Sequence, residues 1–531
     1  MVRNSIIVAL FFFTQVLYAQ VNRYAVFFSD KDGTPYSIDE PETFLSSRSV
    51  ERRLRQGIAI QENDLPVNPE YVAGLTTAGV DVFYTSKWFN LAIIQSQNET
   101  TTTLLDLPYV SEIRLIATDE RLVASGRKKS SWLSRSKSKT TDSQLNQLGV
   151  NNLHNEGFFG AGILVAIFDS GFNGVNTASP FSAIIDQERL QDSFNFVLNT
   201  ADVFDLDDHG TEVLSVIGAE VEEDFTGAAP KSSFALYLTE DESSEFPIEE
   251  FNWLLAAERA DSTGVDIINS SLGYNTFHSP FDDYSIEDMD GNTTVVSRAA
   301  DLAASKGILV VTSAGNEGND NDWGIVTAPA DADSVLSVGS VNALGVISFS
   351  SSNGPTADGQ IKPEVMARGV NTSVINALGN LNTASGTSFS APLIAGMAAC
   401  IWEARPDLTA QQLRDTIISI SDNFDTPNNQ YGYGIPRYGD ILITSVEGAL
   451  RSKIKVFPNP ATSNAITVSG IKYNRPEFTL IAMNGTRSIL KSIQSNEKGN
   501  YRVDLGKISS GTYLVEIDLG NRTQTIKVVK K

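Results

Sequence analysis

Ser388 lies in a stretch, residues 381–396, where glycine and other small residues lead into an expected helix of mostly Ala, Gly and Ile. A hydroxyl at a helix N-terminus lies beside unpaired backbone N–H groups and the positive end of the helix dipole, where negative charge developing on a substrate oxygen is stabilised. Ser388 is therefore a candidate nucleophile. Serine is also a preferred N-cap residue in any protein, so this stretch alone leaves both interpretations open.

Three more polar residues stand at the expected ends of strands and helices. Asp169 is the first polar residue after the apolar run 163–168, and Asn316 lies in the turn after the run 308–312. His209 opens a helical run, in the sequence Asp-Asp-His-Gly-Thr-Glu-Val. The chain has only two other histidines, His154 and His278. Together with the serine, these residues provide an acid, a base, an amide donor and a hydroxyl.

Acyl transfer needs these four groups. A serine hydroxyl is a weak nucleophile until a neutral imidazole accepts its proton, and a carboxylate on the far ring nitrogen fixes the tautomer. An asparagine side chain can donate to the oxyanion. Taken singly, Asp169 in Asp-Ser-Gly and Asn316 between glycines are common turn residues, and His209 alone is an ordinary helix-start histidine. Their joint occurrence, in the chain order Asp, His, Ser, favours catalysis and is the subtilisin order.

Residues 141–446 resemble a subtilisin-like serine peptidase. The motifs that carry the resemblance surround the aspartate, the histidine and the serine, at residues 167–171, 208–211 and 386–392, with a further family-like segment at 349–365. The resemblance implies a catalytic triad of Asp169, His209 and Ser388, with Asn316 in the oxyanion hole. It also implies two substrate-binding segments, an edge that pairs with an extended peptide and the floor of a pocket: Ser271, Leu272 and Gly273, and Ser313, Ala314 and Gly315.

The sequence departs from the family pattern in places. Glu212 stands where a second histidine is usual, and that histidine does no chemistry in the usual mechanism. The resemblance implies no cofactor for catalysis, although calcium often stabilises the family. Asp282 with Asp283, or residues 287–291, could supply oxygen ligands, and a solvated acidic loop is the other interpretation.

Apolar runs at residues 163–168, 265–268, 308–312 and 335–338 show little alternation, as strands buried on both faces of a parallel sheet require. This pattern predicts an α/β domain, and the resemblance makes it a subtilisin-like three-layer domain. Sites on such sheets lie beyond the carboxyl ends of the strands. In the helix that follows Ser388, we expect Pro392 to be tolerated because it falls in the first turn.

The N-terminal part divides into three segments. Residues 1–19 have a positive start, an apolar run and a small final residue, which predicts a signal peptide. Residues 20–125 mix strand-like and helix-like stretches, which indicates a small α+β unit, and by resemblance it is an inhibitory propeptide. Residues 126–140 are basic and Ser-rich, as in a linker, and in an acidic protein such a segment could also be a protease-accessible junction.

Residues 453–531 contain short alternating strands with turn signals, which predicts a β-sandwich. This unit resembles the sorting domain of the type IX secretion system. A carbohydrate-binding module is the alternative, and the absence of tryptophan from this segment disfavours it. Secretion machinery is thus an expected partner of the C-terminal domain.

Composition excludes some functions. The formal net charge of −24 offers no positive field for nucleic acid. Cys400, the single cysteine, excludes an intramolecular disulfide and is expected to be a buried small hydrophobe. No transmembrane segment is expected in the mature chain, and the export signal predicts a product that is secreted or on the cell surface after passage through the periplasm.

The sequence therefore predicts a secreted serine endopeptidase that cleaves protein or peptide substrates through an acyl-enzyme. Its own propeptide is a further expected partner. A catalytically silent surface adhesion protein that retains the fold is the alternative from another class. A processing peptidase with a narrow range of substrates is a third possibility.

Overall fold

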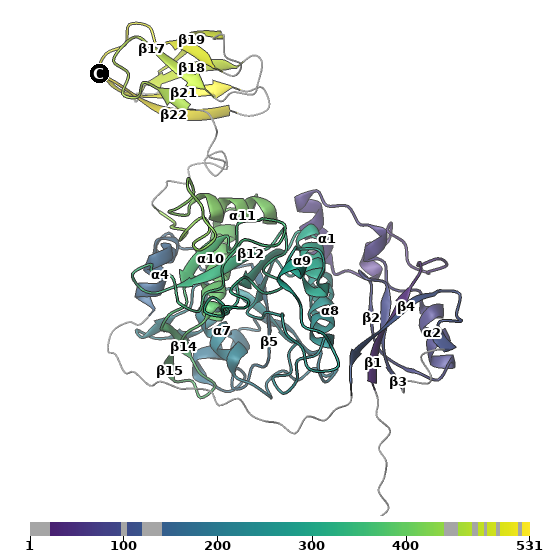
Figure 1. Cartoon of the computed structure of the whole chain (residues 1–531). Coiled ribbons are helices and arrows are strands. Elements are labelled where there is room, and N and C mark those ends of the chain that lie inside the picture. The colour runs from purple at the N-terminus through teal and green to yellow at the C-terminus, as the bar shows by residue number, and fades with distance from the viewer. Residues whose placement is uncertain are drawn as a thin grey trace, which may run out of the picture.

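The computed structural model describes residues 22–96, 103–118, 141–439, 455–469, 476–482, 486–494, 500–518 and 523–531. Within these ranges the chain forms an N-terminal α+β unit, a large central α/β domain and a C-terminal β unit (Figure 1). The predicted signal peptide and basic linker lie outside the described residues. In the described part, no helix is long and apolar enough to cross a membrane.

The N-terminal unit is a four-stranded antiparallel sheet in the order β2-β3-β1-β4, and helices α1 and α2 belong to the same unit. Alternate residues of its central strand point to opposite faces, so that Tyr24 and Val26 pack against the N-terminal core while Ala25 packs against the central domain. This sheet is therefore buried on both faces. Its elements are β1 (Asn22–Phe28), α1 (Ser47–Gln56), α2 (Pro69–Thr77), β2 (Asp81–Ser86), β3 (Leu91–Ser96) and β4 (Val110–Ala117).

A seven-stranded sheet forms the middle of the central domain, in the order β13-β12-β11-β10-β5-β9-β6, and all of its neighbouring strands are parallel. The α/β prediction is confirmed. The edge strand β6 was not predicted, because its polar residues break the apolar pattern. The strands are β5 (Leu164–Asp169), β6 (Leu190–Asn195), β9 (Ser233–Leu238), β10 (Ile267–Ser270), β11 (Leu309–Ser313), β12 (Leu336–Val341) and β13 (Val365–Arg368).

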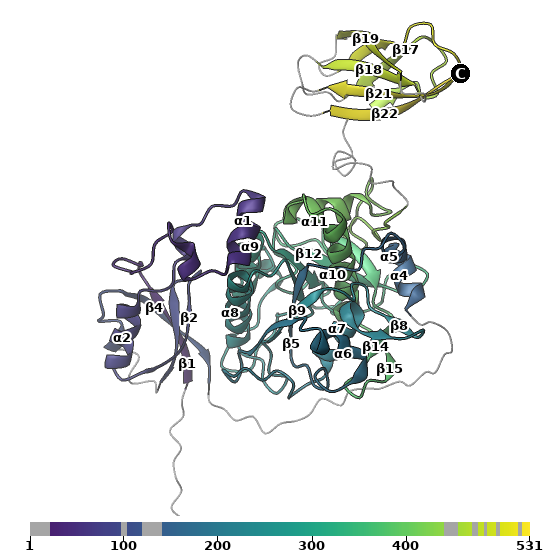
Figure 2. The ribbon, with the colours of Figure 1, turned by 180° about the vertical axis from the view of Figure 1, so that it is seen from behind.

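Helices cover both faces of this sheet (Figures 1 and 2). In β5, Val165 and Ile167 pack against one helical layer, and Leu164, Ala166 and Phe168 pack against the other. The three-layer prediction is thereby confirmed. The first layer contains α4 (Asp142–Leu148), α5 (Val150–Asn155), α7 (His209–Gly218), α10 (Thr387–Ala404) and α11 (Ala410–Ser419), and the second contains α8 (Ile248–Thr263) and α9 (Val295–Ser305). Smaller elements are α6 (Ser182–Asp186), β7 (Glu220–Val221), β8 (Phe225–Thr226), β14 (Thr372–Ile375) and β15 (Leu381–Ala384).

Helix α10 runs through the core, and its small residues permit close packing. A Cβ atom at Gly396 would lie 2.4 Å from the Cβ of Ala228. The expectation for Pro392 is wrong, because the helix begins at Thr387 and the proline is its sixth residue. Proline has no N–H to offer the carbonyl of Ser388 four residues earlier, and the hydroxyl of Ser271 donates to that carbonyl instead, at 2.9 Å.

A buried network of charges joins the N-terminal unit to the central domain. From α1, Arg52 and Arg53 each reach Asp261 on α8, with N–O distances of 2.6 and 2.7 Å. Asp64 pairs with Arg53 at 2.9 Å and with Lys306 of the central domain at 3.0 Å. All of these side chains are buried. Because charges from both units alternate in sign, each unit neutralises charges that the other buries.

The C-terminal unit contains seven antiparallel strands in the order β16-β17-β20-β19-β18-β21-β22. Strand β19 pairs with β18 through residues 487–490 and with β20 through residues 491–494, so it links two groups of strands around one core. This arrangement agrees with the predicted sandwich. The strands are β16 (Lys455–Phe457), β17 (Ala465–Ser469), β18 (Glu477–Ala482), β19 (Arg487–Gln494), β20 (Tyr501–Asp504), β21 (Gly511–Asp518) and β22 (Thr523–Lys530).

Candidate active site

The structure brings the predicted acid and base into direct contact. Asp169 is the last residue of β5, and His209 is the first residue of α7. The Nδ1 atom of His209 donates to Oδ1 of Asp169 at 2.7 Å. Because a carboxylate can only accept, this hydrogen bond places the neutral ring's lone pair on Nε2. His209 is thereby oriented to accept a proton on its far nitrogen.

The surroundings of Asp169 keep its carboxylate fixed. The side chain is fully buried, and its Oδ1 also accepts from the backbone N–H of Ser170 at 2.9 Å. Burial by itself lowers the pKa of His209, but the carboxylates of Asp169, first, and of Asp207 and Glu212 together outweigh burial and raise that pKa to about 9. The pair therefore stabilises the imidazolium, which is the state that forms when the imidazole takes a proton.

Ser388 is the second residue of α10 and is almost buried. In this structure its Oγ donates to the carbonyl of Ser271 at 3.2 Å and not to His209. The imidazole is nonetheless a neighbour, since its ring centroid lies 5.6 Å from that of Phe389, the next residue in the helix. The Ser388 hydroxyl must give up its contact with Ser271 before it can donate to the imidazole, and catalytic hydrogen bonds are often incomplete before substrate binds.

Two N–H donors stand beside Ser388. The Oδ1 atom of Asn316 accepts from the backbone N–H of Thr387 at 2.9 Å and from its hydroxyl at 3.2 Å, which leaves the amide NH₂ of Asn316 as a donor. The backbone N–H of Ser388 belongs to the first turn of α10 and has no acceptor among the described residues. Gly386, just before this turn, has a φ of 149°, which residues with a side chain rarely adopt.

The predicted edge segment directly follows β10. Ser271 exchanges two hydrogen bonds with Ser388, and the carbonyl of Leu272 accepts from the hydroxyl of Ser313 at 3.3 Å. Gly273 is exposed, and its backbone groups have no partner among the described residues. A Cβ at Gly273 would lie 2.2 Å from Oγ1 of Thr327, so only glycine fits there. The free backbone of Gly273 can pair with an extended peptide.

The predicted pocket floor, Ser313 to Gly315, begins at the last residue of β11 and is held by hydrogen bonds. Ala314 donates to the carbonyl of Val338 at 3.0 Å. The carbonyl of Gly315 accepts from the backbone of Ser352 and from the hydroxyl of Thr387, both at 3.1 Å. Thr387 was not predicted as a site residue. The Thr387 hydroxyl donates both to Asn316 and to the carbonyl of Gly315 in the pocket floor. In the sequence, the only indication of this role was its position next to Ser388.

The remaining singled-out residues lie outside this constellation. Cys400 is buried, and burial raises its pKa, so it is an inert thiol. His154 contacts the carbonyl of Ala228, and His278 accepts from the backbone of Glu245. Of the calcium candidates, Asp283, Asp288 and Asp290 bind nearby backbone N–H groups of their own loops. Calcium at those positions stays a prediction.

Comparison with known proteins decides the family. A model of the subtilase family, peptidase S8, matches residues 160–434, which is more than half of the chain. The chain is a subtilase. A model of the peptidase S8 propeptide domain of Bacteroidota matches residues 23–134 of this subtilase, and a model of the secretion system C-terminal sorting domain matches residues 455–531.

Individual relatives agree with this assignment. Subtilisin from Bacillus pumilus is 29% identical over 295 residues, which cover 55% of this chain and 94% of that protein. The subtilisin-like protease PopC from Myxococcus xanthus is 32% identical over 296 residues, 51% of this chain and 58% of PopC. The structure of the epidermin leader peptide processing serine protease from Staphylococcus aureus has a TM-score of 0.54 at 16% identity, covers 78% of this chain and 96% of its own, and shows the shared fold.

This subtilase is therefore a serine-type endopeptidase with a propeptide domain and a sorting domain for export. The matches give no support to a catalytically silent adhesion protein. The predicted domain limits stay predictions.

The Asp169–His209 pair predicts the pH dependence of the reaction. Only neutral His209 can accept a proton, so kcat/KM of the mature enzyme should rise with pH, with a midpoint shifted from about 6.5 toward about 9. In Asp169→Asn the midpoint should fall to about 6.5 or lower, and turnover should fall about 10⁴-fold. The measurement is kcat/KM on a peptide substrate from pH 5 to pH 10. An equal midpoint in both proteins would contradict the role of Asp169.

Proposed function

We propose that this subtilase is a secreted endopeptidase whose catalytic residues are Ser388, His209 and Asp169, with Asn316 and the Ser388 N–H in the oxyanion hole. The observation that carries the proposal is the 2.7 Å contact between His209 and Asp169, beside a serine at the N-terminus of a buried helix. These groups fit the four roles of acyl transfer: nucleophile, base, orienting acid and oxyanion donor.

The mechanism follows from these positions. The Ser388 hydroxyl leaves the Ser271 carbonyl and attacks the carbonyl carbon of the scissile bond, while Nε2 of His209 takes the hydroxyl proton. The Asn316 amide and the Ser388 N–H bind the resulting oxyanion. The imidazolium then gives its proton to the leaving amine, which produces the acyl-enzyme. Water, deprotonated by His209, attacks the acyl-enzyme and restores Ser388.

Substrate should bind as an added strand against residues 271–273. The open backbone of Gly273 would supply main-chain hydrogen bonds, which do not depend on the substrate sequence. Side-chain preference would come from pockets such as the one above the floor at residues 313–315. The rival form of this function, a processing peptidase with a narrow range of substrates, uses the same chemistry and differs only in those pockets.

The N-terminal unit would act as an inhibitory propeptide, removed after cleavage between residues 120 and 142. It packs on α8 and α9 through an apolar face and through the buried charges around Asp261. The sorting domain would deliver the enzyme to secretion machinery after passage through the periplasm, and the product would be secreted or held at the cell surface.

Replacement of the nucleophile tests the function. Ser388→Ala should lower turnover on casein and on the enzyme's own propeptide about a million-fold, because no other group can form the acyl-enzyme. Ser390→Ala is the matched control, since Ser390 is buried two residues later and its hydroxyl has no hydrogen-bond partner within the described ranges. The control should keep its activity. Hydrolysis that survives in Ser388→Ala would disprove the mechanism, and an inactive wild type would favour adhesion.

The charge network predicts how strongly the propeptide holds. Asp261→Asn would leave Arg52 buried without its carboxylate partner and Arg53 with Asp64 alone, a change worth about 3–5 kcal/mol. The inhibition constant of the separately added N-terminal domain for the mature enzyme should therefore rise about 10²- to 10⁴-fold.

Asp422→Asn is the control for this experiment, because Asp422 forms an exposed ion pair with Arg437 outside the interface. The control should leave the inhibition constant unchanged. Equal inhibition of the Asp261→Asn enzyme and the wild type would mean that the ion pairs of Asp261 do not help to hold the propeptide.

A further inference from the structure

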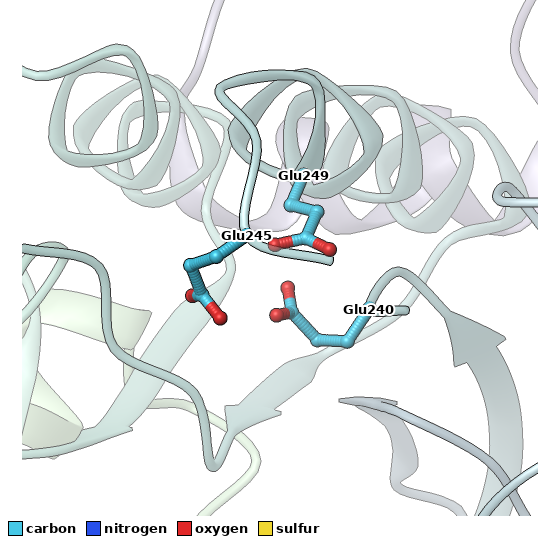
Figure 3. A group of neighbouring side chains, drawn as sticks. All are labelled: Glu240, Glu245 and Glu249. Carbon is cyan, nitrogen blue, oxygen red and sulfur yellow. The ribbon is translucent and has the colours of Figure 1, made fainter. Parts of the chain in front are cut away.

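Three glutamates converge between β9 and α8, outside the predicted catalytic groups. Glu240 follows β9, Glu245 lies in the loop, and Glu249 is in the first turn of α8. One carboxylate oxygen from each lies within 4.8 Å of the other two. Figure 3 shows the carboxylate of Glu249 facing that of Glu240, with Glu245 closing a third side. The three acids thus surround one small space.

The buried carboxylate of Glu249 has a hydrogen-bond donor at only one of its two oxygens among the described residues. The side chain is 1% exposed, and its Oε2 has no hydrogen-bond partner in the described part of the chain, whereas Oε1 accepts from the backbone N–H of Asp241 at 3.2 Å. A buried carboxylate oxygen without a donor is unfavourable and needs an explanation. Because this carboxylate points toward the other two, the missing partner belongs in the space between them.

Glu240 and Glu249 have no basic partner among the residues that the structure describes. In the described part of the chain, neither Glu240 nor Glu249 forms an ion pair with Lys, Arg or His. Burial, together with the nearby Glu245 and Asp169 carboxylates, raises the pKa of Glu240 to about 8, although the Tyr274 hydroxyl donates to it. A cation would relieve this repulsion.

We propose that Glu240, Glu245 and Glu249 bind one calcium ion. Calcium takes oxygen ligands at about 2.3–2.6 Å, so oxygens on opposite sides of the ion are up to about 5 Å apart, which matches the spacing of the cluster. The absence of sulfur and imidazole among these ligands disfavours zinc. Carbonyl groups and water complete the coordination. This site is distinct from the acidic loops at Asp282, Asp283 and residues 287–291.

The ion would brace the approach to the substrate edge. Glu240 accepts from the hydroxyl of Tyr274, which directly follows Gly273. On the other side of the loop, the hydroxyl of Ser170, next to Asp169, donates to Glu242 at 3.3 Å. Calcium between β9 and α8 would therefore hold a loop that contacts Tyr274, beside the substrate edge, and Ser170, beside Asp169.

The test uses the full chain with Ser388→Ala, so that it cannot digest itself, stripped of metal with a chelator. Calcium is titrated by calorimetry, and terbium, a luminescent substitute, is titrated with excitation of tyrosine, because Tyr274 contacts a ligand residue. Glu249→Gln should bind one calcium ion fewer, or bind it at least tenfold more weakly, and lose the sensitised terbium emission. Calcium should raise the unfolding temperature less in this variant.

Glu250→Gln is the matched control. Glu250 is the next residue of α8 and equally buried, but it accepts from the Tyr284 hydroxyl at 2.7 Å and from the backbone of Val296 at 3.2 Å. It should keep the calcium ion. If Glu249→Gln does not fold, the less buried Glu245 replaces it as Glu245→Gln, with the same expected loss. Equal calcium stoichiometry and affinity in Glu249→Gln, in Glu245→Gln and in the Ser388→Ala parent would overturn the proposal. It would also be overturned if these substitutions left calcium binding unchanged and instead altered the preference for basic side chains in the substrate.

Discussion

The close packing of α10 against the centre of the α/β domain is the constraint on which the site depends. The helix passes the sheet so closely that a Cβ at Gly396 would overlap Ala228. Its small residues fix the height of the helix over the sheet, and thus the position of its N-terminus at the edge where β5, β10 and β11 end. Since those strands are parallel, Asp169, Ser271 and Ser313 all reach the same edge.

Contacts at the N-terminus of α10 convert this packing into a specific geometry. Pro392 removes the helical hydrogen bond to the Ser388 carbonyl, and Ser271 replaces it, so the end of β10 is tied to Ser388. Thr387 ties the same turn to Asn316 on the other side. The start of α10 is therefore held between Ser271 on one side and Asn316 on the other.

Local patterns in the sequence predicted the elements that carry the site, and long-range partners escaped prediction. The apolar run at 163–168 matches β5, because a strand that is buried on both faces must be apolar at nearly every position. The network around Asp261 joins residues more than 200 positions apart, which no local pattern reveals. Glu240 and Glu249 look like ordinary surface acids in sequence, and only the turn between β9 and α8 brings them together. Pro392 was misplaced because the sequence did not show where α10 begins.

The account depends on Ser388 being the residue activated by His209. A fluorophosphonate, which bonds only to an activated serine hydroxyl, tests this directly when the mature enzyme is labelled and the modified peptide is identified by mass spectrometry. The account predicts one phosphonyl group per chain, on Ser388, with labelling lost in His209→Ala. A label on another serine, or an active enzyme that takes no label, would contradict it.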